Sequence, residues 1–311
     1  MHWVAVLLLF VALSSQSQTV TQAFGSGASS FSIDFVSIGN AGNAPDTTGK
    51  GAVPYIYNLG KYEVSRDMVI KASTAGGLGL TLQDMTSYGG NGVNRPATGI
   101  SWNEAARFVN WLNTSKGYQA AYKFDTNGNF QLWNLGDTGF MSNNPFRNGL
   151  ARFVLPNMNE WYKGAYGSLN NTWHLFPTGS TYPASVNGGT APDTEIFGFL
   201  NSPADISSAG GLSSFGTMAQ GGNAEEWIED AYDGINDTPN ENRGVLGGHF
   251  NSGNPGSKAV GISGYTTSSE FYFNGFRVAM IPEPSSLSLF LAGGAVLMAG
   301  RRGSKASASY G

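Results

Sequence analysis

The sequence contains no cysteine. This single absence excludes disulfide bonds, thiolate nucleophiles, zinc–cysteine sites and iron–sulfur clusters. We therefore expect the protein to be stabilised by its core, by hydrogen bonds or by hard cations.

Charge is also scarce, because only 12% of the residues are charged, against roughly 25% in an average globular protein. The 17 basic and 21 acidic residues give a net charge of −4, and Lys and Arg form no cluster in the interior of the chain. A basic patch is the electrostatic signature of a nucleic-acid-binding protein. We expect no nucleic-acid partner.

The chain is rich in glycine and in aromatic residues. Its 311 residues include 44 glycines, and 41% are hydrophobic and 13% aromatic, which is enough to bury a sizeable core. Short runs between Gly, Asn, Ser and Pro clusters indicate a loop-rich α+β fold. Because no fixed-period repeat or linker divides the chain, we expect one domain over residues 30–280.

A few segments carry clear secondary-structure signals. Phe31–Ile38 alternates apolar with small polar residues, which predicts a strand, and Tyr55–Val64 is a second candidate strand. Ser101 and Glu104 have the spacing of a capping box, which predicts a helix after Ser101. A short second helix is expected after Pro156. The apolar face of the first helix comprises Ala105, Phe108, Val109 and Leu112.

The N-terminus resembles a signal peptide. The apolar run from Val4 to Leu13 is too short for a membrane-spanning helix of about 20 residues. No basic residue precedes the run, although signal peptides usually have one there. The alternative to a signal peptide is a buried N-terminal helix or strand. The polar residues that follow favour export, so we assign residues 1–23 to a signal peptide.

The C-terminus has three parts in order: a proline-containing segment, Ile281–Ser286, an apolar stretch, Leu287–Ala299, and the basic pair Arg301 and Arg302. Residues 281–302 resemble a PEP-CTERM sorting signal, with 303–311 as a cytoplasmic tail. The resemblance implies an exosortase partner, transient membrane association through Leu287–Ala299, and a location at the cell surface or in the extracellular matrix. A single-pass anchor would have the same topology.

Six short motifs between the two ends resemble, in the same order, those of the formylglycine-generating enzyme or sulfatase-modifying-factor family, which has a C-type-lectin-like fold. The segments are 59–65 (LGKYEVS), 96–105 (PATGISWNEA), 153–161 (FVLPNMNEW), 222–227 (GNAEEW), 243–250 (RGVLGGHF) and 275–278 (GFRV). Bulky aromatic residues more often build a core than a site. We therefore expect core positions for Trp102, Trp111, Trp161, Trp227 and Phe276, and expect Glu160 and Glu226 to hold loops through backbone hydrogen bonds.

The catalytic cysteines of this family are missing. The resemblance places Ser252 and Ser257 where the family's enzymes use two cysteines to bind copper(I). Copper(I) is a soft ion that requires thiolate ligands. We therefore expect no copper(I) and no copper-dependent oxidation of a sulfatase cysteine.

The chain has too few histidines to supply an alternative metal site of three histidines. The chain has only His2, His174 and His249, and His2 lies in the predicted signal peptide, so a three-histidine iron site is excluded. His249 replaces the serine of the family's "GGS" motif. His249, Asn251, Ser252 and Ser257 together form the candidate pocket, although a structural histidine is the alternative at His249.

Calcium is the remaining cofactor that the resemblance implies. Its ligands would be the carbonyl groups of Gly222 and Ala224 and the carboxylate of Glu226. The fourth position is Ala219, which weakens the site. A separate acidic loop that could take a hard cation, or be a solvated turn, contains Asp230, Asp233, Asn236 and Asp237.

These observations favour an exported, surface- or matrix-associated module that binds a glycan or a protein without catalysis. Two other hypotheses remain open. The chain could be an oxidoreductase with a different metal site around His249, Asn251 and Ser252, or a matrix protein without a discrete ligand.

Overall fold

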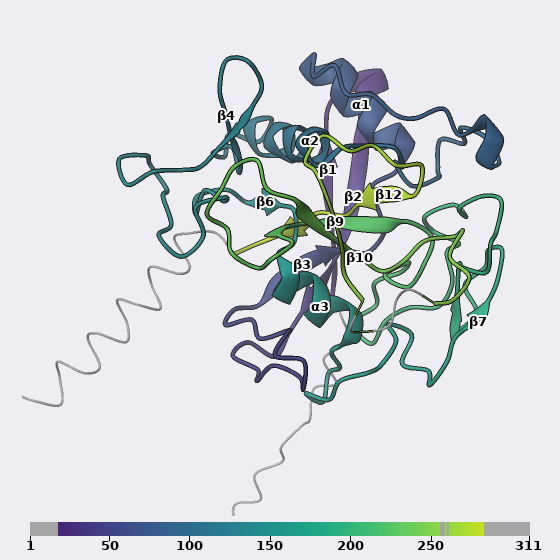
Figure 1. Ribbon diagram of the computed structural model, residues 1–311. Coiled ribbons are helices and arrows are strands. Elements are labelled where there is room, and N and C mark those ends of the chain that lie inside the picture. The colour runs from purple at the N-terminus through teal and green to yellow at the C-terminus, as the bar shows by residue number, and fades with distance from the viewer. Residues whose placement is uncertain (1–17, 256–258, 260, 283–311) are drawn as a thin grey trace, which may run out of the picture.

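Two larger β-sheets and three α-helices form the framework (Figure 1), in a computed structural model that describes residues 18–255, 259 and 261–282. Two further sheets in these residues have two strands each. Ser257, residues 1–17 of the expected signal peptide and residues 283–302 of the expected sorting signal lie outside these residues. The helices are α1 (Arg66–Gly76), α2 (Trp102–Thr114) and α3 (Met158–Tyr166), with the 3₁₀ turns η1 (Gly27–Ser29) and η2 (Thr86–Tyr88). The strands are β1 (Thr19–Phe24), β2 (Phe31–Ile38), β3 (Tyr57–Gly60), β4 (Lys123–Phe124), β5 (Phe130–Gln131), β6 (Phe153–Val154), β7 (Ala184–Ser185), β8 (Thr194–Glu195), β9 (Glu225–Ala231), β10 (Arg243–Leu246), β11 (Ser263–Tyr265), β12 (Asn274–Phe276) and β13 (Ala279–Met280).

The larger sheet has the strand order β1-β2-β3-β13-β6. The predicted strand Phe31–Ile38 is β2. Of the candidate strand Tyr55–Val64, only Tyr57–Gly60 forms a strand, which is β3. β1 pairs antiparallel with β2 over six residues, from Thr19 opposite Val36 to Phe24 opposite Phe31. The folded part of the chain therefore begins by Thr19, earlier than the expected boundary at residue 30.

The smaller sheet has the order β11-β10-β9-β12 and positions the candidate sites. β10 runs antiparallel to β9, with Arg243 opposite Ala231 and Leu246 opposite Glu226. One end of this sheet therefore leads into the loop after Leu246, and the other end leads into the loop after Ala231.

Both predicted helices form with capping boxes. The Ser101 side chain accepts a hydrogen bond from the Glu104 amide, and Glu104 accepts one from the Ser101 amide. Asn157 and Glu160 do the same at the start of α3. Each cap satisfies backbone donors that a helix start otherwise leaves unpaired.

The helix α1 was not expected. Its N-cap is Ser65, and it ends at Gly77, which has the positive φ of 60° that glycine tolerates. Only Arg66, Val69 and Ala72 are buried along it, so its apolar face is too narrow to show in the sequence.

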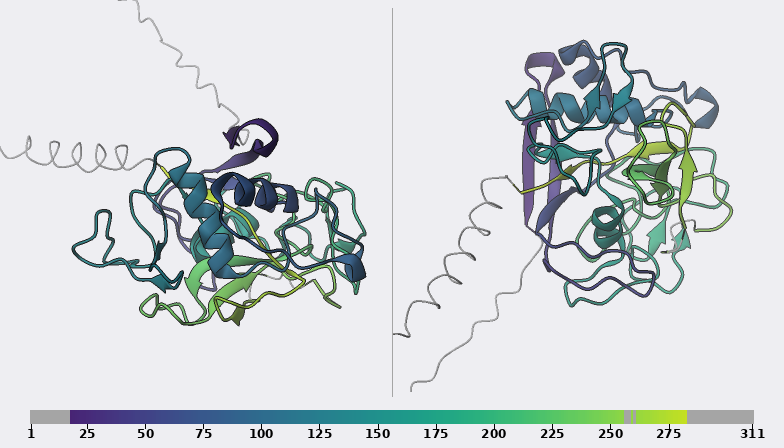
Figure 2. Two further views of the ribbon diagram at one scale, coloured as in Figure 1. Left: turned by 90° about the horizontal axis from the view of Figure 1, so that it is seen from above. Right: turned by 60° about the vertical axis from the view of Figure 1, so that its left-hand side comes forward.

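The helices lie on different sides of the sheets: α1 and α2 are together on one side and α3 is on the other (Figures 1 and 2). Four of the five aromatic residues expected in the core are fully buried, and Trp111 is partly buried against the cluster that contains Trp102, Trp227 and Phe276. The α+β, loop-rich, single-domain prediction is confirmed. None of the helices in the described part of the chain has the length and apolarity needed to cross a membrane.

Candidate functional site

The loop after β10 brings three of the predicted pocket residues together. The His249 amide donates to the Ser252 hydroxyl at 3.3 Å, and the Ser252 amide donates back to the His249 carbonyl at 3.0 Å. The Asn251 amide donates to Nδ1 of His249 at 3.2 Å. The fourth predicted residue, Ser257, lies outside the described residues.

The ring of His249 is packed as an aromatic side chain. It stacks on Phe273 with 4.3 Å between ring centroids and an interplanar angle of 15°. Burial lowers the pKa of His249 to about 4, since an apolar environment disfavours the charged ring. Next to it, the Asn251 side-chain amide donates to the Tyr272 hydroxyl at 3.0 Å. At neutral pH this histidine is uncharged, with Nδ1 already accepting a hydrogen bond.

This loop does not fit the copper site that the resemblance implies. The Ser252 hydroxyl is a hard oxygen that already accepts the His249 amide hydrogen, whereas copper(I) requires soft sulfur ligands. In the described residues, no hydrogen bond joins this hydroxyl to the His249 ring. Ser252 therefore lacks the adjacent base that activates a serine nucleophile.

The expected calcium ligand Glu226 is occupied by other partners. Both its carboxylate oxygens accept hydrogen bonds at 2.5 Å from Arg277, and Oε2 also accepts the Trp161 indole hydrogen at 2.6 Å. An arginine at this carboxylate supplies the positive charge that calcium would bring. Glu226 therefore does not fit a calcium site, and it binds side chains rather than the loop backbone that we expected.

Glu63 holds the loop that contains the other two expected ligands, Gly222 and Ala224. Its carboxylate accepts the Ala224 amide at 3.0 Å and the Asn223 side-chain amide at 2.6 Å. Burial and the nearby Glu226 raise the pKa of Glu63. The sequence offered no role for this glutamate beyond its place in a strand motif.

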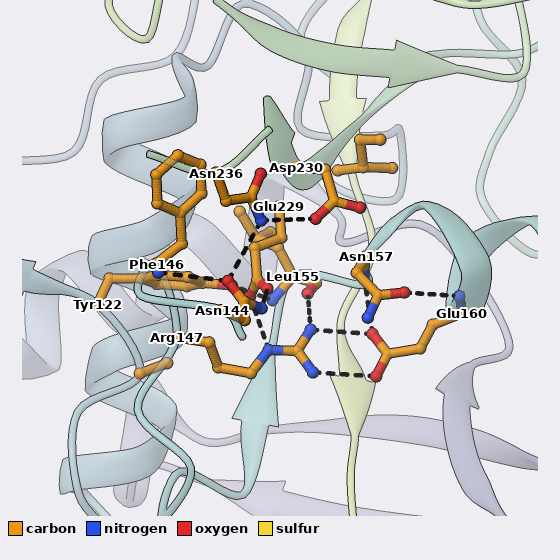
Figure 3. A network of polar contacts seen from close by, with 12 residues as sticks. Tyr122, Asn144, Phe146, Arg147, Leu155, Asn157, Glu160, Glu229, Asp230 and Asn236 are labelled. Carbon is orange, nitrogen blue, oxygen red and sulfur yellow. Dashed lines mark hydrogen bonds and ion pairs between the residues drawn. The ribbon is translucent and has the colours of Figure 1, made fainter. Parts of the chain in front are cut away.

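A buried ion network lies at the opposite end of β9 (Figure 3). Arg147 binds both carboxylate oxygens of Glu160, at 3.0 and 2.9 Å, and its Nε donates to Glu229 at 2.7 Å. All three side chains are at most 3% exposed. Burial alone would raise the pKa of Glu160, but Arg147 holds it below its usual value. The two carboxylates thus fix the guanidinium from two sides.

Amide side chains extend this network to Asp230 (Figure 3). Asn144 donates to Glu229 at 2.6 Å and accepts from Asn236 at 3.2 Å. Asn236 also donates to Asp230 at 2.9 Å, and Asp230 accepts the Met158 amide at 2.6 Å. Asp230 and Asn236 belong to the predicted acidic loop.

The acidic loop does not gather its carboxylates. Asp233 accepts the Ile235 amide at 2.9 Å, and Asp237 accepts the Thr238 hydroxyl at 2.7 Å, so each binds its own turn. Within residues 18–255, 259 and 261–282, no three His, Asp or Glu side chains are grouped to hold a metal ion. The loop instead forms one wall of a cleft.

This polar cleft has a volume of about 630 Å³. Its walls come from four segments: the loop before β3, the loop with Asn143–Arg147, the start of α3 and the acidic loop. The side chains that line it include Lys50, Tyr55, Asn143, Asn144, Asn157, Asn159, Asp230, Tyr232, Asp233 and Asn236. The cleft thus combines amide, carboxylate and tyrosine side chains with apolar ones such as Met141, Met158 and Ile262, and Arg147 of the ion network also lines it.

The fold and the loop after β10 define a protein of the formylglycine-generating-enzyme-like class that lacks its cysteines. A profile of the sulfatase-modifying factor enzyme 1-like domain matches residues 52–281. The chain belongs to this family. Among curated proteins, none matches the sequence.

Three solved structures share the fold at low sequence identity. Treponema denticola variable protein 1 has a TM-score of 0.57 and 17% identity, over 85% of this chain and 99% of its own. CarF has a TM-score of 0.56 and 18% identity, over 86% of this chain and 98% of its own. PvdO from Pseudomonas aeruginosa has a TM-score of 0.53 and 15% identity, over 84% of this chain and 98% of its own. These likenesses establish the architecture only.

Proposed function

We propose that the protein is an exported, surface- or matrix-associated module that binds a glycan or protein ligand without catalysis. The observation that carries the proposal is the polar cleft at the end of β9, which Arg147 lines while the buried Glu160 and Glu229 hold its guanidinium in place. A site whose polar groups are already held in place loses little freedom on binding.

Several groups in the cleft are free to bind a ligand. Asn157 and Asn159 use their side-chain oxygens for the Glu160 and Gly51 amides, and in the described residues their amide nitrogens have no partner. Tyr232 is 50% exposed at the rim. Amides beside an exposed ring suit a polyhydroxyl ligand such as a sugar, because the ring offers an apolar face and the amides form hydrogen bonds.

The experiment is a glycan-array screen of the mature chain, followed by titration with the best ligand. Tyr232→Ala and Asn143→Ala should each weaken binding about tenfold or more. Tyr182→Ala is the matched control, because Tyr182 is 63% exposed and lies outside this cleft. Binding that is unchanged in both cleft variants would exclude this site, and a mature chain that binds neither glycans nor surface proteins would refute the proposal.

The absence of cysteine, the soft ligand that copper(I) requires, supports the non-catalytic half of the proposal. The alternative, an oxidoreductase with another metal near His249, makes a distinct prediction. Metal analysis of protein prepared with and without air should find no stoichiometric copper or iron. A stoichiometric redox metal that His249→Phe removes would favour the alternative.

Export and sorting by an exosortase-type partner rest on the two ends of the sequence. Because β1 is part of the sheet, we propose that the leader is cleaved before Thr19 rather than at residue 23. Mass spectrometry of the native protein should find an N-terminus before Thr19 and a C-terminus before Leu287. A chain that still contains Arg301 and Arg302 would refute cleavage of the sorting signal.

A further inference from the structure

Lys163 is a buried cation without a carboxylate partner. It lies in the last turn of α3 and is 2% exposed. Its Nζ donates to the Asn40 carbonyl at 2.8 Å, and no ion pair forms with it in the described part of the chain. Burial lowers the pKa of Lys163 to about 8, so the side chain is still mainly charged at neutral pH.

This lysine lines a second pocket, which we call the lysine pocket, with a volume of about 540 Å³. The pocket lies between the loop Asn40–Pro45 and the segment Gly167–Trp173, and Phe215 completes its lining. Most polar side chains there are satisfied internally: Asn40 binds the Ser168 and Leu169 carbonyls, and Ser168 binds Thr172.

Lys163 and Trp173 supply the lysine pocket with hydrogen-bond donors. An ammonium group has three N–H bonds, and Lys163 uses one. The Trp173 indole N–H has no hydrogen-bond partner among the described residues, and the exposed side chain of Asn171 places a further amide at the pocket. A pocket with a charge and several free donors is complementary to an anion with oxygen acceptors.

The uncompensated charge itself points to a ligand. A buried charge costs free energy unless it is paired, and one carbonyl supplies only a partial negative charge. A ligand with a negative group bound at Lys163 would pair this charge and reduce the free-energy cost of burying it. The partly buried ring of Trp173, which also lines the pocket, favours a ligand with an apolar face beside its charge.

We propose that the lysine pocket binds the carboxylate of an acidic saccharide through the ammonium group of Lys163. The inference goes beyond the proposed function, because it assigns a second site and a ligand charge. The two sites share α3: Asn159 lines the polar cleft and Lys163 the lysine pocket, about 6 Å apart along the helix axis.

The test is calorimetric titration of the full mature chain with D-glucuronate, D-glucose and N-acetyl-L-glutamate. Glucuronate should bind at least tenfold more tightly than glucose. The Lys163→Met variant, which keeps the side-chain length without the charge, should bind glucuronate about 10- to 100-fold more weakly. Lys71→Met, which removes one positive charge from α1, is the matched control and should bind as the wild type does.

The Met variant should also fold, because it removes an unpaired buried charge, and its melting temperature should be at least that of the wild type. Equal binding of glucuronate to wild type and Lys163→Met would overturn the proposal, as would a wild type that does not bind glucuronate. Tighter binding of N-acetyl-L-glutamate than of glucuronate would overturn the saccharide assignment. The polar cleft is tested separately by Tyr232→Ala, so failure at one site is distinguishable from failure at the other.

Discussion

Arg277 and Glu226 form a two-point ion pair in which neither side chain is exposed to solvent. The guanidinium also donates to the Gly60 and Met218 carbonyls, both at 2.8 Å. Arg277 lies between β12 of the smaller sheet and β13 of the larger one. The pair therefore stabilises the point where the chain passes from one sheet to the other.

Breaking this pair should be severely destabilising. Glu226→Gln leaves the Arg277 charge buried without a full counter-charge, so we expect the free energy of unfolding to fall by about 3–5 kcal/mol. Urea unfolding measures the change. Asp67→Asn, which breaks the partly exposed pair of Asp67 with Lys71, is the control and should cost less than about 1 kcal/mol. Equal losses in both variants would contradict the structural role assigned to Glu226.

Glu225, the neighbour of Glu226 on β9, should destabilise the protein as pH rises. Burial raises the pKa of Glu225 to about 7, and Oε2 is buried without a hydrogen-bond partner in the described residues. Below about pH 4.5 the carboxyl group is protonated in both the folded and the unfolded state. Between pH 4.5 and 7 only the unfolded state ionises readily, so folding loses stability, and above pH 7 the cost is complete.

The variant that tests this is Glu225→Gln. Its free energy of unfolding should exceed that of the wild type by about 1–3 kcal/mol at pH 8, and this advantage should shrink as the pH falls to 4. Denaturant unfolding at both pH values measures it. A difference that does not change with pH would show that Glu225 keeps an ordinary pKa in the folded protein.

The features that could be predicted from sequence are those with a local signal. The capping box of Ser101 and Glu104 spans four residues, and the apolar face of α2 repeats with the helical period, so both could be recognised before the structure. The alternation of apolar and small polar residues in Phe31–Ile38 likewise predicted the strand β2. By contrast, α1 has three buried residues, which is too weak a pattern to distinguish a helix from a loop.

The site residues that were missed depend on contacts between distant segments. Arg147 binds Glu229, which is 82 residues away in the sequence, and nothing near either residue indicates the pair. Lys163 has an ordinary position near a helix end, and its burial depends on tertiary contacts such as the hydrogen bond to the distant Asn40 carbonyl. The low charge content is the one sequence signal for these residues. In a chain with so few charges, a charged residue between aromatic ones is a candidate for a buried ion pair or a binding site.

The strand β1 is expected to be part of the folded unit. Phe24 is buried against Phe31, Trp111 and Phe153, and six residues of β1 pair with β2. A chain that begins at residue 25 loses these contacts and exposes an edge of β2. It should unfold at a lower temperature, by at least several degrees, than a chain that begins at residue 18. Equal melting temperatures by calorimetry would place β1 outside the folded unit.

Lys163 should give the protein an unusual gain in stability at alkaline pH. The pKa of Lys163 is lowered to about 8 by burial, against 10.5 for an ordinary lysine. Below pH 8 the amine is charged in both states, and the full cost of burying it is present. Between pH 8 and 10.5 the folded protein releases this proton first, so folding gains stability; above 10.5 the amine is neutral in both states and the cost is gone.

The difference between Lys163→Met and the wild type isolates this effect from all other titrating groups. The Met variant should be the more stable of the two at pH 7, and its advantage should shrink by about 1–3 kcal/mol by pH 10, as measured by denaturant unfolding at each pH. Saturating glucuronate should reduce the same advantage at pH 7, because a bound carboxylate pairs the charge and stabilises only the folded wild type. An advantage that is constant from pH 7 to 10 would mean that Lys163 is better solvated than its burial indicates.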